Sequence, residues 1–231
     1  RPQSYLRETL WSDAPVSHIV VTPPVPSFPL NPDKADWSVW DFPDVVDHWN
    51  FPGYEGKKMT VSVYSNCEQV ELFLNGESLG KQENTADKKN TLVWEVPYAH
   101  GILKAVSYNK GGEVGTATLE SAGKVEKIRL SADRTEIVAD GNDLSYITLE
   151  LVDSKGIRNQ LAEELVEFSI EGDATIEGVG NANPMSIESF VANSRKTWRG
   201  SNLLVVRSGK SSGRIIVTAK VKALPVASIT I

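Results

Sequence analysis

The sequence is poor in the residues that build most metal centres, because it has one cysteine and three histidines among 231 residues. The single cysteine, Cys67, excludes an internal disulfide and any zinc site made of several cysteines. The histidines, His18, His48 and His100, are far apart and match no metal-binding spacing. We therefore predict no metal centre and no cofactor.

A dense basic stripe and a long apolar run are also absent. The net charge is -6 and the isoelectric point is near 5.2, which argues against nucleic acid as a partner. No apolar run reaches the length of a membrane span. The chain begins RPQSYLRETLW, without the features of a secretion signal, so we expect it to be a piece of something longer.

What the sequence does contain is one helical pattern followed by many strand patterns. Residues 2–11 favour a helix, because Pro2 suits a first turn and Leu6 and Leu10 lie four residues apart, with Tyr5 and Trp11 as further apolar contacts. Strands are predicted for SHIVVT and, from Met59 onward, for MTVSVYS, EQVELFLN, ESLGKQ, TLVWEVP, ILKAVSYN and EVGTATLE.

The stretch VELFLNGESLG, residues 70–80, predicts a β-hairpin. Val70, Leu72 and Leu74 alternate with polar neighbours, so they share the core face of a strand. Asn75 and Gly76 accept the positive φ angles of a tight primed turn. We interpret this hairpin as scaffold.

A second strand series begins after Gly123 and predicts a second sandwich. It reads VEKIRLSA, TEIVAD, SYITLELVD, LVEFSIEG, ATIEGV, LLVVRS, GRIIVTAKV and VASITI. The spacing is typical of immunoglobulin-like folds. We predict an all-β chain of two immunoglobulin-like antiparallel β-sandwich domains in tandem, at 16–123 and 124–231, with residues 1–15 as a separate leading segment.

The proline-rich segment 16–58 contains a cluster of aromatic residues that includes Trp37, Trp40 and Trp49. Open rings of this kind can stack on sugars, with nearby carboxylates and amides for the hydroxyl groups. The alternative is that the rings fill a core or seal an interface between domains. The sequence favours the packing interpretation and keeps the three tryptophans as candidate carbohydrate contacts.

Three acidic residues in the same segment are candidate cation ligands. Asp41, Asp44 and Asp47 lie three apart, but no glycine-turned loop or bidentate glutamate accompanies them. A solvated acidic loop is the favoured interpretation. Asp140-Gly141-Asn142-Asp143 is more simply a turn.

Two short motifs resemble catalytic or nucleotide-binding loops without their context. GKSSG at 209–213 matches the nucleophile elbow around Ser211, but a strand pattern follows where a helix is needed. GVGNAN at 178–183 lacks the third glycine and the helix of a dinucleotide loop, and we interpret it as a loop. We assign no catalytic residue.

Several stretches resemble glycoside hydrolase family 2, in its bacterial β-galactosidase-like branch, over essentially the whole chain. The first half carries the asparagine-cysteine, LFLNG and YAHG-LKA elements in order. The second half, with ADRTEIVADGNDLSYITLELVDSKG, GVGNANP and residues 188–190, resembles the last immunoglobulin-like domain of these enzymes and also the repeats of invasin-type adhesins.

The resemblance implies that residues 1–15 are the remnant of the last helix of a catalytic barrel and that the catalytic carboxylates lie upstream. A (β/α)₈ barrel needs about 250 residues of alternating strand and helix, which this chain does not offer. The expected role is non-catalytic support of a family 2 glycosidase. The expected partner is the barrel of the parent chain, with an oligomer possible, and the expected location is periplasmic or extracellular in a bacterium.

Two alternatives remain at this point. The chain could be a carbohydrate-binding module that holds an enzyme near a polysaccharide or oligosaccharide through exposed tryptophans. It could also be an adhesin-like extracellular spacer, which only the second half suggests.

Overall fold

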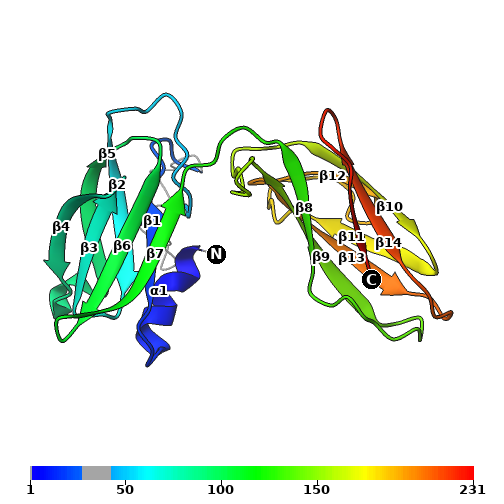
Figure 1. Cartoon of the computed structure of the whole chain (residues 1–231), viewed down its shortest axis with the longest axis horizontal. Helices are drawn as coiled ribbons and strands as arrows, with labels where there is room; N and C mark the ends of the chain where they lie inside the picture. The colour runs from blue at the N-terminus through cyan, green and yellow to red at the C-terminus, as the bar shows by residue number, and fades with distance from the viewer. Residues whose placement is uncertain (1, 28–42) are drawn as a thin grey trace, which may run out of the picture. The chain divides into compact units, whose positions relative to one another are not determined.

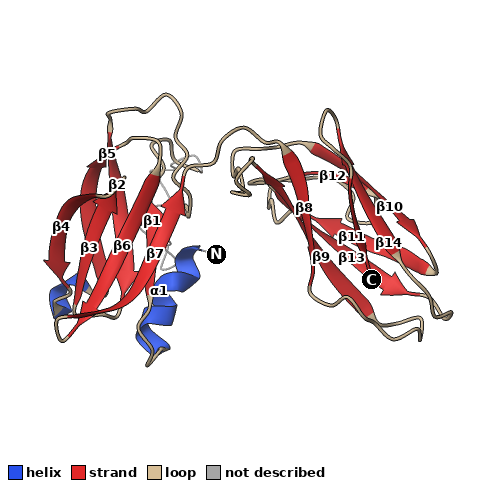
Figure 2. Cartoon of the chain, in the orientation of Figure 1, coloured by secondary structure: helices blue, strands red, loops and turns tan. Residues whose placement is uncertain are grey.

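The computed structural model describes residues 2–27 and 43–231. The chain forms two compact units, Arg1–Ser121 (unit 1) and Ala122–Ile231 (unit 2). Figures 1 and 2 show that the regular structure of both units is almost entirely β, with one short helix near the start of the chain. The predicted all-β fold class is confirmed. Within the described residues, no helix has the length and apolarity needed to cross a membrane.

Unit 1 is an antiparallel sandwich preceded by the helix α1. Its elements are α1 (Pro2–Trp11), β1 (Ser17–Val21), β2 (Lys58–Ser65), β3 (Gln69–Leu74), β4 (Glu77–Glu83), the 3₁₀ turn η2 (Ala86–Lys88), β5 (Thr91–Pro97), β6 (Ile102–Asn109) and β7 (Gly112–Glu120). One sheet has the order β1-β2-β5 and the other has the order β4-β3-β6-β7.

The core of unit 1 lies between these sheets. Val70, Leu72 and Leu74 of β3 are buried, as the alternation predicts. Asn75 and Gly76 have φ angles of 52° and 87°, which confirms the predicted primed turn.

The helix α1 uses only one side against this sandwich. Tyr5 and Leu6 pack against buried Val20, Val45 and Tyr64. Leu10 and Trp11, which the sequence predicts as apolar contacts, are instead 63% and 80% exposed. The helical prediction for residues 2–11 is confirmed, but only half of its apolar face is covered.

Unit 2 is a second antiparallel sandwich of two four-stranded sheets, ordered β12-β10-β14-β15 and β11-β13-β9-β8. Its strands are β8 (Lys127–Ala132), β9 (Leu144–Val152), β10 (Leu165–Glu171), β11 (Ala174–Gly180), β12 (Ser194–Lys196), β13 (Ser201–Ser208), β14 (Ile216–Val221) and β15 (Ala227–Thr230). The core contains buried Ile147, Leu149 and Phe168 among others.

In unit 2, one strand prediction is wrong, one loop interpretation is wrong in part, and one strand was missed. TEIVAD, residues 135–140, forms no strand, because the carboxylate of Asp143 accepts the Val138 N–H (2.8 Å) and so replaces a partner strand. Residues 178–180 of the predicted loop GVGNAN belong to β11. The short strand β12 was missed because its sequence, SRK, has no apolar alternation.

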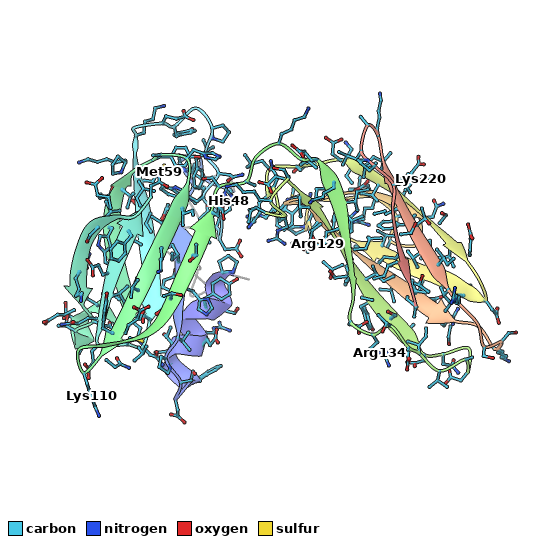
Figure 3. The ribbon with its side chains drawn as sticks, in the orientation of Figure 1. His48, Met59, Lys110, Arg129, Arg134 and Lys220 are labelled. Carbon is cyan, nitrogen blue, oxygen red and sulfur yellow. The ribbon has the colours of Figure 1, made fainter. Side chains whose placement is uncertain are left out.

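Charged side chains on the outer face of unit 2 pair across neighbouring segments. Figure 3 shows Arg129 and Arg134 on this unit; Arg129 Nη2 lies 2.6 Å from Glu150 Oε2, and Arg134 Nη2 lies 2.9 Å from Asp143 Oδ1. Exposed pairs of this kind add little stability.

Candidate functional site

The candidate carbohydrate contacts do not form a site in the described part of the chain. Trp37 and Trp40 lie outside the described residues. Trp49 is fully buried, with its ring edge-on to Tyr98 (centroids 4.9 Å apart) and its Nε1–H donated to the Ala99 carbonyl (2.8 Å). Its ring offers no face to a sugar, so we correct its assignment from candidate contact to core residue.

The candidate cation ligands have local hydrogen-bonding roles where the structure describes them. Asp41 lies outside the described residues. Asp44 Oδ2 accepts the Ser27 N–H (2.6 Å), and Asp47 Oδ2 accepts the Tyr5 hydroxyl (3.2 Å). Across residues 2–27 and 43–231, no group of three or more His, Cys, Asp or Glu side chains is placed to hold a metal ion.

The loop GKSSG is a turn organised by an aspartate. Asp173 Oδ2 accepts the N–H groups of Lys210 (2.9 Å) and Ser211 (2.7 Å). The Ser211 N–H lowers the pKa of Asp173 below its usual value, because this donor favours the charged carboxylate. The chain then continues into β14, a strand, so Ser211 has no nucleophile-elbow geometry.

The asparagine-cysteine motif holds the connection between α1 and β1. Asn66 Nδ2 donates to the carbonyls of Ser12 (3.0 Å) and Ala14 (2.9 Å), and Asn66 Oδ1 accepts the Val16 N–H (2.8 Å). Cys67 is a buried free thiol. One amide side chain therefore fixes three backbone groups of a segment that has no ladder partners of its own.

The LFLNG and YAHG motifs meet at the start of β6. Asn75 Nδ2 donates to the His100 carbonyl (3.2 Å), and Asn75 Oδ1 accepts the Ile102 N–H (2.8 Å). Gly101 has a φ of 141°, and a Cβ at this position would lie 1.9 Å from Asn75 Oδ1. We call this pair of Asn75 hydrogen bonds the Asn75 clasp. Only glycine at position 101 leaves room for it.

The residues just before Gly101 connect this clasp to the aromatic segment. The Tyr98 hydroxyl accepts the Phe51 N–H (3.0 Å), beside the bond from Trp49 to Ala99. Ser121 donates its hydroxyl to the Trp49 carbonyl. In unit 1, Asn66 and Asn75 therefore each bond to the backbone of another segment, and Trp49, Tyr98 and Ser121 form further bonds that join the aromatic segment to the sandwich.

Unit 2 has an equivalent anchor in the VDSKG stretch. Asp153 accepts the N–H groups of Gly123 (2.8 Å), Lys155 (3.0 Å) and Ile157 (2.9 Å), and Asn159 Nδ2 donates to the Gly123 carbonyl (2.9 Å). Burial raises the pKa of Asp153, but the three N–H donors and the Lys155 charge outweigh burial, so the pKa lies below its usual value.

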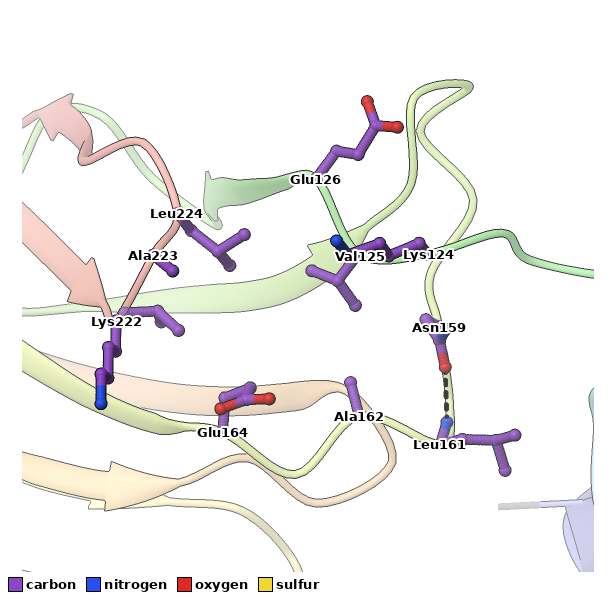
Figure 4. A pocket seen from close by; sticks show the side chains of 11 residues that line it. Lys124, Val125, Glu126, Asn159, Leu161, Ala162, Glu164, Lys222, Ala223 and Leu224 are labelled. Carbon is purple, nitrogen blue, oxygen red and sulfur yellow. Dashed lines mark hydrogen bonds between the residues drawn. The ribbon is translucent and has the colours of Figure 1, made fainter.

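A groove of about 700 Å³ lies at the edge of unit 2. Figure 4 shows Val125 and Leu224 pointing toward each other across it. Its lining residues include Lys124, Glu126, Glu164 and Lys222 but no histidine, cysteine or serine. The groove is lined by apolar and charged side chains and offers no nucleophile-base pair.

Two family models match the chain. The glycoside hydrolase family 2 C-terminal domain 5 matches residues 128–230, and a domain of unknown function, DUF4982, matches residues 56–115. The first match falls within unit 2 and the second within unit 1.

The chain is similar to part of several longer glycosidases. It is 33% identical over 192 residues to the β-galactosidase BoGH2A of Bacteroides ovatus, covering 83% of this chain and 22% of that protein. It is 30% identical over 205 residues to a β-glucuronidase of Formosa agariphila, covering 86% of this chain and 20% of that one.

A solved structure supports the same assignment. A glycosyl hydrolase family 2 member from Bacteroides cellulosilyticus is 95% identical, with a TM-score of 0.94, and the match covers 100% of this chain and 30% of that chain. A β-glycosidase from Bacteroides vulgatus is 26% identical with a TM-score of 0.84. The chain spans between 20% and 30% of the length of the first three relatives.

Sequence reasoning missed what the polar motif residues do. Asn66, Asn75 and Asp153 each sit beside the end of a strand, a position that suits side chains bonding to the backbone, and this signal was available. Nothing in the sequence predicted that Arg195 is completely buried, because Ser194, Arg195 and Lys196 are all polar and suggest an exposed segment.

Proposed function

We propose that this chain, which belongs to the C-terminal region of glycoside hydrolase family 2, is a non-catalytic support for the catalytic part of a longer glycosidase. The observation that carries the proposal is the use of the family motif residues. Asn66, Asn75, Gly101 and Asp153 hold backbone segments together inside the two units. Such residues stabilise a scaffold, and catalysis by two carboxylates needs instead a pair held about 5 Å or more apart around a substrate.

The exposed side of α1 supports a packed partner next to unit 1. Leu10 and Trp11 are 63% and 80% exposed, although α1 is anchored through Tyr5 and Leu6. We propose that α1 is the last helix of a catalytic barrel and that Leu10 and Trp11 pack on its neighbours. The relatives named β-galactosidase and β-glucuronidase favour a β-glycoside as the substrate of the longer protein.

A hydrolysis assay tests this function. The isolated chain and a chimera, in which this chain replaces the matching 30% of the Bacteroides cellulosilyticus protein, are assayed on a panel of aryl β-glycosides. The expected result is hydrolysis by the chimera and none by the chain. The proposal would be overturned if the isolated chain hydrolysed a substrate at a rate proportional to its concentration and kept that specific activity after repeated purification.

Carbohydrate binding is tested separately by affinity gel electrophoresis through galactose-containing and other polysaccharides. Trp37→Ala and Trp40→Ala are the informative variants, and buried Trp49 is not one of them. A support role predicts that the chain migrates equally with and without polysaccharide. Retardation that either variant abolishes would establish the binding-module alternative.

A further inference from the structure

Residues 181–193 of unit 2 connect β11 to β12, two strands that Figure 1 labels. This loop exposes large apolar side chains. The exposed fractions are 79% for Met185, 100% for Ile187, 62% for Phe190 and 80% for Val191. Single exposed apolar residues are ordinary, but several within one loop mark an interaction surface or a site of association.

A buried arginine of β12, Arg195, contacts several residues of this loop. The Arg195 side chain is completely buried, and its Nη1 donates to the carbonyls of Glu188 (3.1 Å) and Val179 (3.3 Å), while Nη2 lies 3.1 Å from Ser186 Oγ. Its guanidinium also stacks on the Phe190 ring, 4.2 Å from the centroid. A buried charge is costly unless it is paired and hydrogen-bonded, so these contacts hold the loop in one arrangement.

Four polar side chains of the loop, those of Asn181, Asn183, Ser186 and Glu188, have local hydrogen-bond partners. Glu188 accepts the Lys196 N–H (3.0 Å) and the Ser186 hydroxyl (3.0 Å), and Asn181 Nδ2 donates to the Lys196 carbonyl (2.9 Å). The Asn183 side chain accepts the Met185 N–H (2.9 Å). These four side chains bond within unit 2, whereas the apolar side chains face outward, so the loop is ordered before any partner binds.

We propose that Met185, Ile187, Phe190 and Val191, the apolar loop surface, dock on an apolar surface of the remainder of the longer glycosidase chain. This inference rests on the proposed function, which supplies the partner. The match to 30% of the Bacteroides cellulosilyticus chain leaves most of such a protein available for this contact. A sugar is a poorer fit, because Asn181, Asn183, Ser186 and Glu188, which could bind its hydroxyl groups, already bond within unit 2.

The size of the surface favours a partner in the same chain over a second copy. Stable association of separate chains typically uses about 20–30 residues on each side. The apolar loop surface offers four large side chains. A tethered partner needs less area, since the connection gives it an effective concentration in the millimolar range.

Cysteine labelling tests the proposal without relying on activity. Ile187→Cys is introduced into the isolated chain and into the chimera defined above, and the rate of reaction with a maleimide is measured. Cys67 is buried, so its background reaction is slow. The expected result is rapid labelling in the isolated chain and labelling at least tenfold slower in the chimera.

Val138→Cys is the matched control, because Val138 is 64% exposed in another loop of unit 2. It is expected to label at the same rate in both proteins. Equal, rapid labelling of Ile187→Cys in both would overturn the proposal while leaving the hydrolysis result untouched. Slow labelling in the isolated chain that speeds up on dilution would also overturn it, because a second copy would then be the occupant.

A stability measurement gives independent evidence. Ile187→Asp is expected to leave the unfolding midpoint of the isolated chain unchanged, because the side chain is fully exposed there. In the chimera it is expected to lower the midpoint of unfolding, since docking would bury the new charge. An unchanged midpoint in the chimera contradicts the proposal.

Discussion

Gly76 occupies the second position of the tight turn after β3, where φ is 87°. A β-branched residue resists this conformation, so Gly76→Val is expected to destabilise unit 1 by about 1–3 kcal/mol. The measurement is chemical denaturation. Gly115→Val is the control, because Gly115 lies in β7, has open space at its Cβ position and has no left-handed φ. Equal stability of Gly76→Val and the wild type would contradict the assigned turn.

Asn75 and Gly101 are expected to be energetically coupled. Gly101→Ala should cost about 2 kcal/mol or more, through both its φ and the clash with Asn75 Oδ1, and Asn75→Ala should cost about 1–3 kcal/mol of hydrogen bonding. The double variant should lose less than the sum, because removing the amide removes the clash. If the losses of the two single variants simply add in the double variant, Asn75 and Gly101 are not coupled.

Individual residues differ in how far the sequence predicts them. Val70, Leu72, Leu74, Asn75 and Gly76 follow from local alternation and turn chemistry, and the structure agrees. The second role of Asn75, as a clasp on β6, depends on a segment about 25 residues away and has no local pattern. The burial of Trp49 also has no local pattern, because a cluster of aromatic residues is compatible with both core packing and sugar stacking.

At the scale of elements, Asp153 bonds the first residues of unit 2 to the end of β9. Its lowered pKa predicts that the stability of unit 2 depends on pH. A carboxyl with a lowered folded-state pKa stabilises the fold above its unfolded value of about 3.9, and this contribution is lost as pH falls through the folded value. Unfolding free energy should therefore fall below about pH 4.

Asp153→Asn provides the comparison. The variant should be less stable than the wild type at neutral pH, and the difference should narrow as the pH falls below about 4, where the wild-type carboxyl becomes protonated. The measurement is denaturation across the acid range. A difference that stays constant with pH would mean that the charge of Asp153 does not stabilise unit 2.

Arg195 of β12 should matter far more than an exposed arginine on a neighbouring element. Arg195→Met leaves the Val179 and Glu188 carbonyls without this donor and should cost about 2–3 kcal/mol, with faster proteolysis within residues 181–193. Arg207→Met, which removes an exposed pair with Glu177, should cost less than about 1 kcal/mol. Equal losses in the two variants would show that Arg195 does not shape the loop.

Element predictions succeeded where side-chain alternation is regular and failed where carboxylates replace ladder partners. In β9 and β13, buried residues alternate with half-buried or exposed ones, and both strands were expected. Residues 135–140 contain the β-formers Thr135, Ile137 and Val138, but the Asp143 carboxylate accepts the Val138 N–H and the segment forms no strand. Such competition between side chain and backbone is invisible to periodicity alone.

For the whole molecule, composition and strand spacing were sufficient for the all-β class, whereas the role depends on protein that lies outside this chain. A longer glycosidase would explain both the uncovered side of α1 and the apolar loop surface of unit 2. Its barrel as a partner, an oligomer and a periplasmic or extracellular location all stay predictions.

Thermal inactivation of the chimera tests the support role most directly. Gly101→Ala, which is expected to weaken unit 1, is compared with Gly115→Ala on the aryl β-glycoside that the chimera hydrolyses fastest. A support role predicts an unchanged kcat/KM at low temperature and faster loss of activity on heating for Gly101→Ala alone. Identical inactivation rates for the two variants would contradict the claim that this chain stabilises a catalytic partner.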